Sequence, residues 1–262
     1  MVRKVKTFDE LCENRKKWVE ISKDNDFDEG ILKLLTELYP DKAHFVYELL
    51  QNAEDAKATK VSFKLYKDRL EFVHNGLRLF NLEDIDSITS IANTTKTKED
   101  HSIGKFGVGF KAVFSYTKTP QIHSGEWSFE IDNLVVPTPI KPLKEFESNK
   151  TYFIFPFNNP KKTSDKAYAE TADGLRKLKP ETLLFLNNIQ ELSYEINKEC
   201  YRIYKNEEEH IVSLYQDNQT TPIAKYLRFV KDNIQLETSN VLIKKLSVAL
   251  AYKLEEDKDK RL

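Results

Sequence analysis

Apolar and polar positions follow a helical period through the N-terminal part of the chain. This period predicts one helix from Leu11 to Ile21 and a second one over ILKLLTEL (31–38). Tyr39 and Pro40 end the second pattern, and Asp41 stands where it would cap a third helix. We therefore expect three helices before the first strand.

The third helix has two distinct faces. Its apolar residues follow the i, i+3, i+4, i+7 spacing of a core-facing stripe: Val46, Leu49, Leu50 and Ala53. On the other side, Glu48, Asn52 and Asp55 are spaced four and three residues apart, which places them on one narrow polar stripe. An acid, an amide and an acid in this arrangement are most often an ordinary solvated face, so the stripe alone does not identify a site.

The period then changes to two, which is typical of strands. VSFKLY (61–66), a Lys67-Asp68 turn and RLEFV (69–73) predict a hairpin that leads directly into His74-Asn75-Gly76. The same criteria predict further helices at 82–91, 109–116, 165–178 and 183–186, and further strands at 121–123, 127–131, 151–157, 191–196, 201–204 and 246–254. The last strand has nothing after it in the sequence to pair with, which suggests that the chain is the front part of a longer protein.

Composition narrows the class of protein. The 262 residues contain 41 Lys and Arg against 42 Asp and Glu, so the net charge of -1 lacks the basic excess of a dedicated nucleic-acid binder. With 40% hydrophobic and 32% charged residues, the chain fits a soluble globular protein. No apolar run approaches the roughly 20 residues of a membrane span, and the N-terminus lacks a secretory signal, so we expect a cytoplasmic protein.

The cysteines indicate no site, whereas the glycines form a candidate phosphate-binding turn. Cys12 and Cys200 are far apart and lack neighbours at metal spacing, so they indicate neither a zinc site nor a disulfide framework. The chain has only 7 glycines, yet three of them fall in GKFGVGF (104–110). Such a G-x-x-G-x-G turn before a helix lets backbone amides approach a phosphate. It matches neither the Walker sequence nor the dinucleotide order of glycines, and by itself it fits a simple turn equally well.

Three motifs in a fixed order resemble the GHKL ATPase superfamily of gyrase, the ninety-kilodalton heat-shock chaperones, histidine kinases and MutL. They are ELLQNAEDA (48–56), a strand that ends in HNG (74–76), and the glycine cluster. The likeness is greatest to the sacsin-type, chaperone-like branch, in which an ELLQNA-x-DA helix precedes a G-x-FG-x-GFK-x-VF segment. It covers about residues 31–157 and extends more loosely to LLFLNNI (183–189).

This resemblance implies a fold and a division of the chain. The fold would be an α+β two-layer sandwich, in which helices cover one face of a mixed, largely antiparallel sheet and a lid closes over ATP. We expect an N-terminal helical segment (1–30), the ATP-binding domain (31–190), and additional strands (191–262) that begin a following domain.

The resemblance also assigns roles to the polar stripe. Glu48 takes the place of the general base that activates water, and Asn52 that of the Mg²⁺ ligand. Asp55 and Ala56 would support the base pocket. Histidine kinases usually carry asparagine at the position of Glu48, so the glutamate favours hydrolysis over phosphotransfer.

Other implied contacts surround the nucleotide. Lys96 and Lys105 are lid candidates for neutralising phosphate charge, although each also fits an ordinary solvated lysine. Thr151 resembles the threonine that helps to bind adenine through water, but threonines at strand starts are common. The remaining nucleotide-contacting positions implied by the motifs are His74, Gly76, Gly104, Gly107, Val108, Gly109 and Phe110.

One departure from the superfamily pattern affects the base. Where the pattern reads D-x-G-x-G, with the aspartate accepting a hydrogen bond from the adenine amino group, this chain reads His74-Asn75-Gly76-Leu77-Arg78. If His74 replaces the acid, it accepts that bond only as neutral imidazole, so ATP affinity should fall as the pH drops through the histidine pKa, which is near 6.5 if unperturbed.

Three functions remain open at this point. The first is a slow Mg²⁺-dependent ATPase that uses lid closure as a conformational, chaperone-like switch, with a nucleotide-dependent homodimer as one form of output. The second is a nucleotide-binding interaction module without turnover. The third is the ATPase part of a nucleic-acid-processing or defence protein, although the near-neutral charge argues against direct nucleic-acid contact.

Overall fold

A computed structural model describes residues 7–23, 43–90, 109–237 and 242–255, with only the backbone described for 232–237 and 242–247. Among these residues, no helix is both long and apolar enough to span a bilayer. The described helices are α1 (Phe8–Lys23), α3 (Phe45–Asp55), α4 (Leu82–Thr89), α5 (Ser164–Arg176) and the 3₁₀ helices η1 (Gly109–Ser115) and η2 (Pro180–Phe185).

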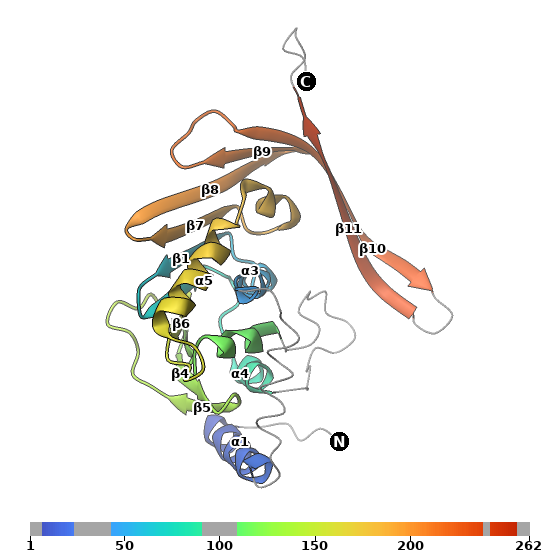
Figure 1. Cartoon of the computed structure of the whole chain (residues 1–262). Helices are drawn as coiled ribbons and strands as arrows, with labels where there is room; N and C mark the ends of the chain where they lie inside the picture. Colours follow the sequence, from blue (N-terminus) through green and yellow to red (C-terminus); the bar gives the residue numbers. More distant parts are fainter. Residues whose placement is uncertain (1–6, 24–42, 91–108, 238–241, 256–262) are drawn as a thin grey trace.

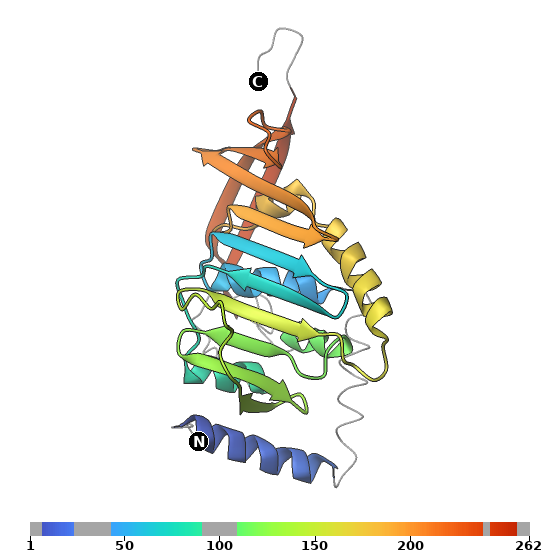
Figure 2. The same cartoon turned by 90° about the vertical axis from the view of Figure 1, so that its left-hand side faces the viewer.

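One open sheet of 11 strands organises the described part of the chain, in the order β11-β10-β9-β8-β7-β1-β2-β6-β3-β4-β5 (Figure 2). Among the described strands, only the β1–β7 pair is parallel, so the sheet is mixed and mostly antiparallel. The strands are β1 (Lys60–Leu65), β2 (Arg69–His74), β3 (Gln121–Ser124), β4 (Trp127–Asp132), β5 (Val136–Pro139), β6 (Thr151–Pro156), β7 (Glu191–Ile196), β8 (Glu199–Glu208), β9 (Ile211–Gln216), β10 (Ala224–Glu237) and β11 (Leu242–Leu254).

The core lies between the sheet and helices on one of its faces (Figure 1). Helix α3 buries its apolar stripe against this face, and η1 and α4 lie beside it. Aromatic side chains of adjacent strands form the floor: the rings of Phe63 and Phe72 stack with centroids 4.5 Å apart, and Phe153 lies 5.9 Å from Phe72. The α+β class and the placement of these helices agree with the expectation from sequence.

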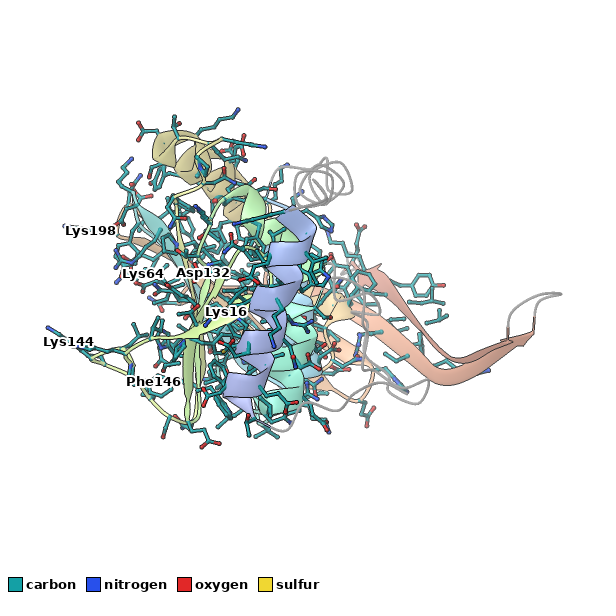
Figure 3. All side chains as sticks on the ribbon, turned by 90° about the horizontal axis from the view of Figure 1, so that it is seen from below. Lys16, Lys64, Asp132, Lys144, Phe146 and Lys198 are labelled. Atoms are coloured by element: carbon teal, nitrogen blue, oxygen red, sulfur yellow. The ribbon has the colours of Figure 1, made fainter. Side chains whose placement is uncertain are left out.

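The opposite face of the sheet carries charged side chains in cross-strand pairs. Arg202 and Glu191 approach to 2.7 Å, and Lys64 and Glu195 to 3.5 Å. The segment 140–150 crosses part of this face, and Figure 3 shows Phe146 and Lys144 on it, on the same side as Lys64. The face is thus largely solvated, and the helix-covered face is where a buried site can form.

Several elements differ from those expected from the sequence. Strands β5, β9 and β10 were not predicted. The helix predicted at 109–116 is present as the 3₁₀ helix η1, whereas α3 begins at Phe45 after His44, which makes no side-chain cap hydrogen bond. The final strand does not lack a partner, because β11 pairs antiparallel with the preceding β10. Asp41 and the helix predicted at 31–38 lie outside the described residues, and the boundary predicted at residue 190 stays a prediction.

Candidate functional site

Helix α3 presents the polar stripe predicted from its spacing. Glu48, Asn52 and Asp55 are half-buried, whereas the apolar stripe on the other side of the helix is buried. The Glu48 side chain is 17% exposed, and its Oε1 lies 3.5 Å from Nε2 of His44, one turn earlier. A carboxylate and an amide therefore stand one turn apart on the margin of the core, within reach of a ligand beside the helix.

Gly109 brings the glycine segment against this stripe. A Cβ atom built on Gly109 would lie 1.8 Å from Oε2 of Glu48 and 2.4 Å from its Cδ. No real Cβ contact is this short, so the backbone of η1 approaches the carboxylate only because residue 109 has no side chain. Two motifs separated by sixty residues of sequence are in direct contact at this point.

Three polar side chains form a row across one end of the sheet. His74 on β2 pairs with Thr151 on β6, which pairs with Ser124 on β3. Directly paired residues point to the same face, which here is the helix-covered one. All three are buried, and the hydroxyl oxygens of Ser124 and Thr151 lie 2.6 Å apart. Ser124 also accepts a hydrogen bond from the backbone N–H of Phe80 at 3.1 Å.

His74 differs from the expectation drawn for it. The backbone N–H of Gly76 donates to Nδ1 of His74 at 3.1 Å, so one ring acceptor is already used inside the chain. Burial lowers the pKa of His74 to about 4. A loss of ATP affinity through protonation of His74 would therefore be expected near pH 4 rather than near pH 6.5, because the ring stays neutral until then.

The HNG segment joins the end of α3 to the sheet. A Cβ atom on Gly76 would lie 2.8 Å from Cβ of Ala56 and 2.9 Å from Nδ1 of His74, so glycine is required for this approach. Asn75 accepts hydrogen bonds from the backbone N–H groups of Thr59 and Lys60 with its Oδ1 at 3.0 and 2.8 Å. Ala56, Gly76 and His74 are thus contiguous, as the motif order predicts.

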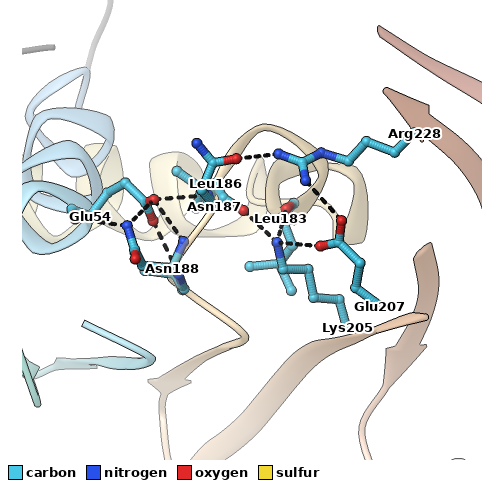
Figure 4. Close-up of polar contacts among 9 residues, drawn as sticks. Glu54, Leu183, Leu186, Asn187, Asn188, Lys205, Glu207 and Arg228 are labelled. Atoms are coloured by element: carbon cyan, nitrogen blue, oxygen red, sulfur yellow. Dashed lines mark hydrogen bonds and ion pairs between the residues drawn. The ribbon is translucent and has the colours of Figure 1, made fainter. Parts of the chain in front are cut away.

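Glu54 is a polar residue of this helix that the sequence analysis missed. Its Oε1 accepts hydrogen bonds from the backbone N–H groups of Asn187 and Asn188 and from the Asn188 side chain, at 2.7–2.8 Å. Its Oε2 accepts from the N–H of Ile189 at 3.0 Å. Figure 4 shows this cluster, which fixes the LLFLNNI segment to the end of α3.

The cluster continues to the C-terminal strands. Arg228 on β10 donates to Oδ1 of Asn187 and, at 3.0 Å, to Glu207 on β8 (Figure 4). Lys205 donates to the carbonyl oxygens of Leu183, at 3.2 Å, and Leu186. Burial, with a smaller effect of Arg228, lowers the pKa of Lys205. A partly buried polar network therefore connects the helix that carries Glu48 and Asn52 with β8 and β10.

Lys111, in the GFK part of the glycine motif, is a structural residue. Its Nζ donates to the carbonyl oxygens of Ile88 at 2.8 Å and Leu134 at 2.5 Å, and the side chain is fully buried. Burial, with a smaller effect of Arg15, lowers the pKa of Lys111 to about 7. The amine thus links the end of α4 to the loop before β5 through these two hydrogen bonds.

The remaining candidates divide into two groups. Phe110 is buried with its ring 6.1 Å from that of Phe153, so any contact with a ligand would come from its backbone. The other residues lie outside the described part of the chain: Lys96, Gly104, Lys105, Gly107 and Val108. The lid expected over the nucleotide also falls there.

The donor set near α3 suits a hard cation only in part. Among the described residues, no group of three or more His, Cys, Asp or Glu side chains is placed to hold a metal ion. Asn52 offers one amide oxygen, which is the kind of ligand that Mg²⁺ accepts when phosphate and water supply the rest. The described residues near α3 thus offer one amide ligand that suits Mg²⁺ bound to a phosphate chain.

Comparison with known proteins supports the sacsin-type likeness. Residues 72–133, which include the HNG segment and Gly109, match the model of the sacsin domain. The chain is 33% identical over 120 residues to Protein NO VEIN of Arabidopsis thaliana, covering 42% of this chain and 4% of that protein. It is 26% identical over 224 residues to sacsin of Homo sapiens, covering 64% of this chain and 5% of sacsin. The chain thus contains a sacsin-domain match, is distantly homologous to both proteins, and spans only a small part of their length.

Proposed function

We propose that this chain binds a magnesium–nucleoside triphosphate between α3 and the sheet and hydrolyses it slowly. The observation that carries this proposal is the contact between Glu48 and Gly109, because it joins the acid of the polar stripe to the glycine motif. The row of His74, Thr151 and Ser124 supports it by offering polar groups on the same face of the sheet. ATP is the nucleotide implied by the resemblance to GHKL proteins.

Three residues have separate roles in the proposed hydrolysis. The Glu48 carboxylate accepts a proton from the attacking water, whose oxygen forms a bond to the terminal phosphorus while the bond to the diphosphate oxygen breaks. Asn52 would hold Mg²⁺, which would neutralise charge along the phosphates. Glycine at position 109 lets backbone approach the carboxylate without a side chain between them.

We further propose that nucleotide occupancy is passed to the C-terminal strands as a change of conformation, in a chaperone-like manner. The support is the network from Glu54 through Asn187 to Arg228, since Glu54 lies two residues after Asn52 on α3. A ligand that binds one arrangement of this network better than another shifts the population toward it.

The test is Glu48→Gln, with Glu126→Gln as a matched control on an exposed turn. Because a base acts on water in the transition state, Glu48→Gln should lower phosphate release by about 100-fold or more. Nucleotide affinity should stay within about threefold of the parent. Equal phosphate release in Glu48→Gln and the parent would contradict the assignment of the base.

A second candidate is a nucleotide-binding module without turnover. It is favoured by the replacement of the usual aspartate by His74, which alters the base site but not the phosphate side. Saturable nucleotide binding by the parent without phosphate release, in the presence of Mg²⁺, would select this module over the hydrolase.

A further inference from the structure

The ring of His74 has a fixed hydrogen-bonding polarity. Because the N–H of Gly76 donates to Nδ1 at 3.1 Å, Nδ1 must carry its lone pair rather than a proton. In a neutral imidazole the proton then sits on Nε2, which becomes a donor. The contact is local, between residues i and i+2, and Asn75 holds the intervening turn against the start of β1.

The surroundings keep the ring neutral and leave Nε2 available. The rings of Phe72 and Phe153 lie 5.8 and 6.1 Å away, and burial lowers the pKa of His74 to about 4. Within the described part of the chain, Nε2 of His74 has no hydrogen-bond partner. Among the described residues, the fully enclosed polar atoms without a partner include Nε2 of His123 but not Nε2 of His74.

The neighbouring hydroxyl groups are adaptable by comparison. Ser124 accepts from the N–H of Phe80, so its own proton is available for Thr151, whose proton is then available for a third group. The opposite direction of the Ser124–Thr151 bond is equally allowed, and Thr151 then offers a lone pair. Thr151 can thus match either a donor or an acceptor on a base, and His74 cannot.

We infer that His74 reads the nucleobase as a hydrogen-bond donor through Nε2–H, so that the site takes 6-oxopurine nucleotides at least as well as adenine nucleotides. This inference rests on the proposed function, because it concerns the base end of the same nucleotide. It reverses the expectation that His74 accepts a hydrogen bond from the adenine amino group. The 6-oxo group of guanine or hypoxanthine is an acceptor, whereas the 6-amino group of adenine is a donor.

The consequence is a change of specificity at one residue. If the 6-amino group of adenine faced Nε2–H of His74, two donors would oppose each other and a polar group would stay unpaired. A site discriminates against a ligand that leaves its polar groups unpaired in this way. An aspartate at position 74 would offer only acceptors and would restore the preference for the amino group.

The experiment is calorimetric titration with Mg-ITP, Mg-GTP and Mg-ATP, because ITP differs from ATP chiefly at the 6-position. The parent should bind ITP as tightly as ATP or more tightly, and His74→Asp should shift the ratio of the two dissociation constants at least tenfold toward ATP. Leu77→Asp, which adds the same charge at an exposed position, should leave the ratio unchanged. Binding of ATP by the parent more than threefold tighter than ITP would overturn the inference while leaving the proposed function intact.

Failure of all three nucleotides to bind would overturn the proposed function together with this inference. If His74→Asp does not fold, the tautomer itself is the test. A long-range ¹H–¹⁵N spectrum of the parent should show Nδ1 of His74 unprotonated and Nε2 protonated, with Nε2 shifting on addition of ITP. Protonation at Nδ1 instead would overturn the inference.

Discussion

Gly109 and Glu48 are so close that a Cβ atom on the glycine would lie 1.8 Å from the Oε2 atom of the glutamate. Glycine at position 109 therefore leaves the space that the Glu48 carboxylate occupies where α3 meets η1. This space lets the carboxylate lie beside the glycine segment, where a base for water activation must be close to the bound phosphate.

We expect Gly109→Ala to disturb this contact. The new methyl group must displace the Glu48 carboxylate, which is the end of a flexible, half-buried side chain, so we expect a loss of about 1 kcal/mol in the free energy of unfolding, at the low end of the range for overpacking. Phosphate release should fall with it, because the carboxylate moves. Chemical denaturation and a phosphate-release assay measure the two effects.

A double-mutant cycle separates crowding from other effects. In the Glu48→Ala background, the methyl group of Gly109→Ala has room, so its cost should fall by at least half. An equal cost of Gly109→Ala in both backgrounds would contradict the contact between the two residues.

The Glu54 carboxylate should be a major source of stability. Glu54→Gln places an NH₂ group opposite backbone N–H donors, which we expect to lower the free energy of unfolding by about 1–3 kcal/mol. Glu126→Gln, on an exposed turn, should change it by less than about 0.5 kcal/mol. Denaturant titration of both variants gives the comparison, and similar small effects would show that the Glu54 cluster contributes nothing specific.

Much of this site was readable from sequence because its signals are local. The spacing of Glu48, Asn52 and Asp55 defines one face of a helix whatever lies around it, and the HNG and glycine motifs add a fixed order. That order assigned Glu48 and Gly109 to one phosphate site, but their direct contact was not predicted.

The rest was hidden for physical reasons. Glu54 lies in a polar run and looks solvated, since its partners are 133–135 residues away in sequence. Strand β5 carries two prolines, Pro137 and Pro139, which are unfavourable in a sheet interior but tolerated here on its edge strand. The tautomer of His74 depends on the backbone of Gly76, which no pattern of side chains reveals.

The buried His74 should also make stability depend on pH. Its pKa of about 4 in the folded chain lies below the ordinary value of 6.5, so the unfolded chain takes up a proton first as the pH falls. The free energy of unfolding should therefore decrease between pH 6.5 and pH 4, by up to about 3 kcal/mol from this residue. Above pH 6.5 the ring is neutral in both the folded and the unfolded chain, so His74 should not make the free energy of unfolding depend on pH.

Denaturation of the parent and of His74→Asn across this pH range measures the contribution. The pKa of His123 is also lowered by burial, but that residue is present in both proteins, so the difference between them reports His74. Parallel pH profiles for the two proteins would show that His74 is not held neutral.

The central claim is that α3 and the sheet bind a magnesium–nucleotide, and calorimetric titration of Mg-nucleotides into the chain tests it most directly. The parent should show saturable one-site binding of at least one of ATP, GTP and ITP that weakens when Mg²⁺ is chelated. Asn52→Ala should reduce this affinity by about tenfold or more, since it removes the amide oxygen assigned to the metal. The absence of binding heat with all three nucleotides at millimolar concentration, together with an unchanged melting temperature, would contradict the claim.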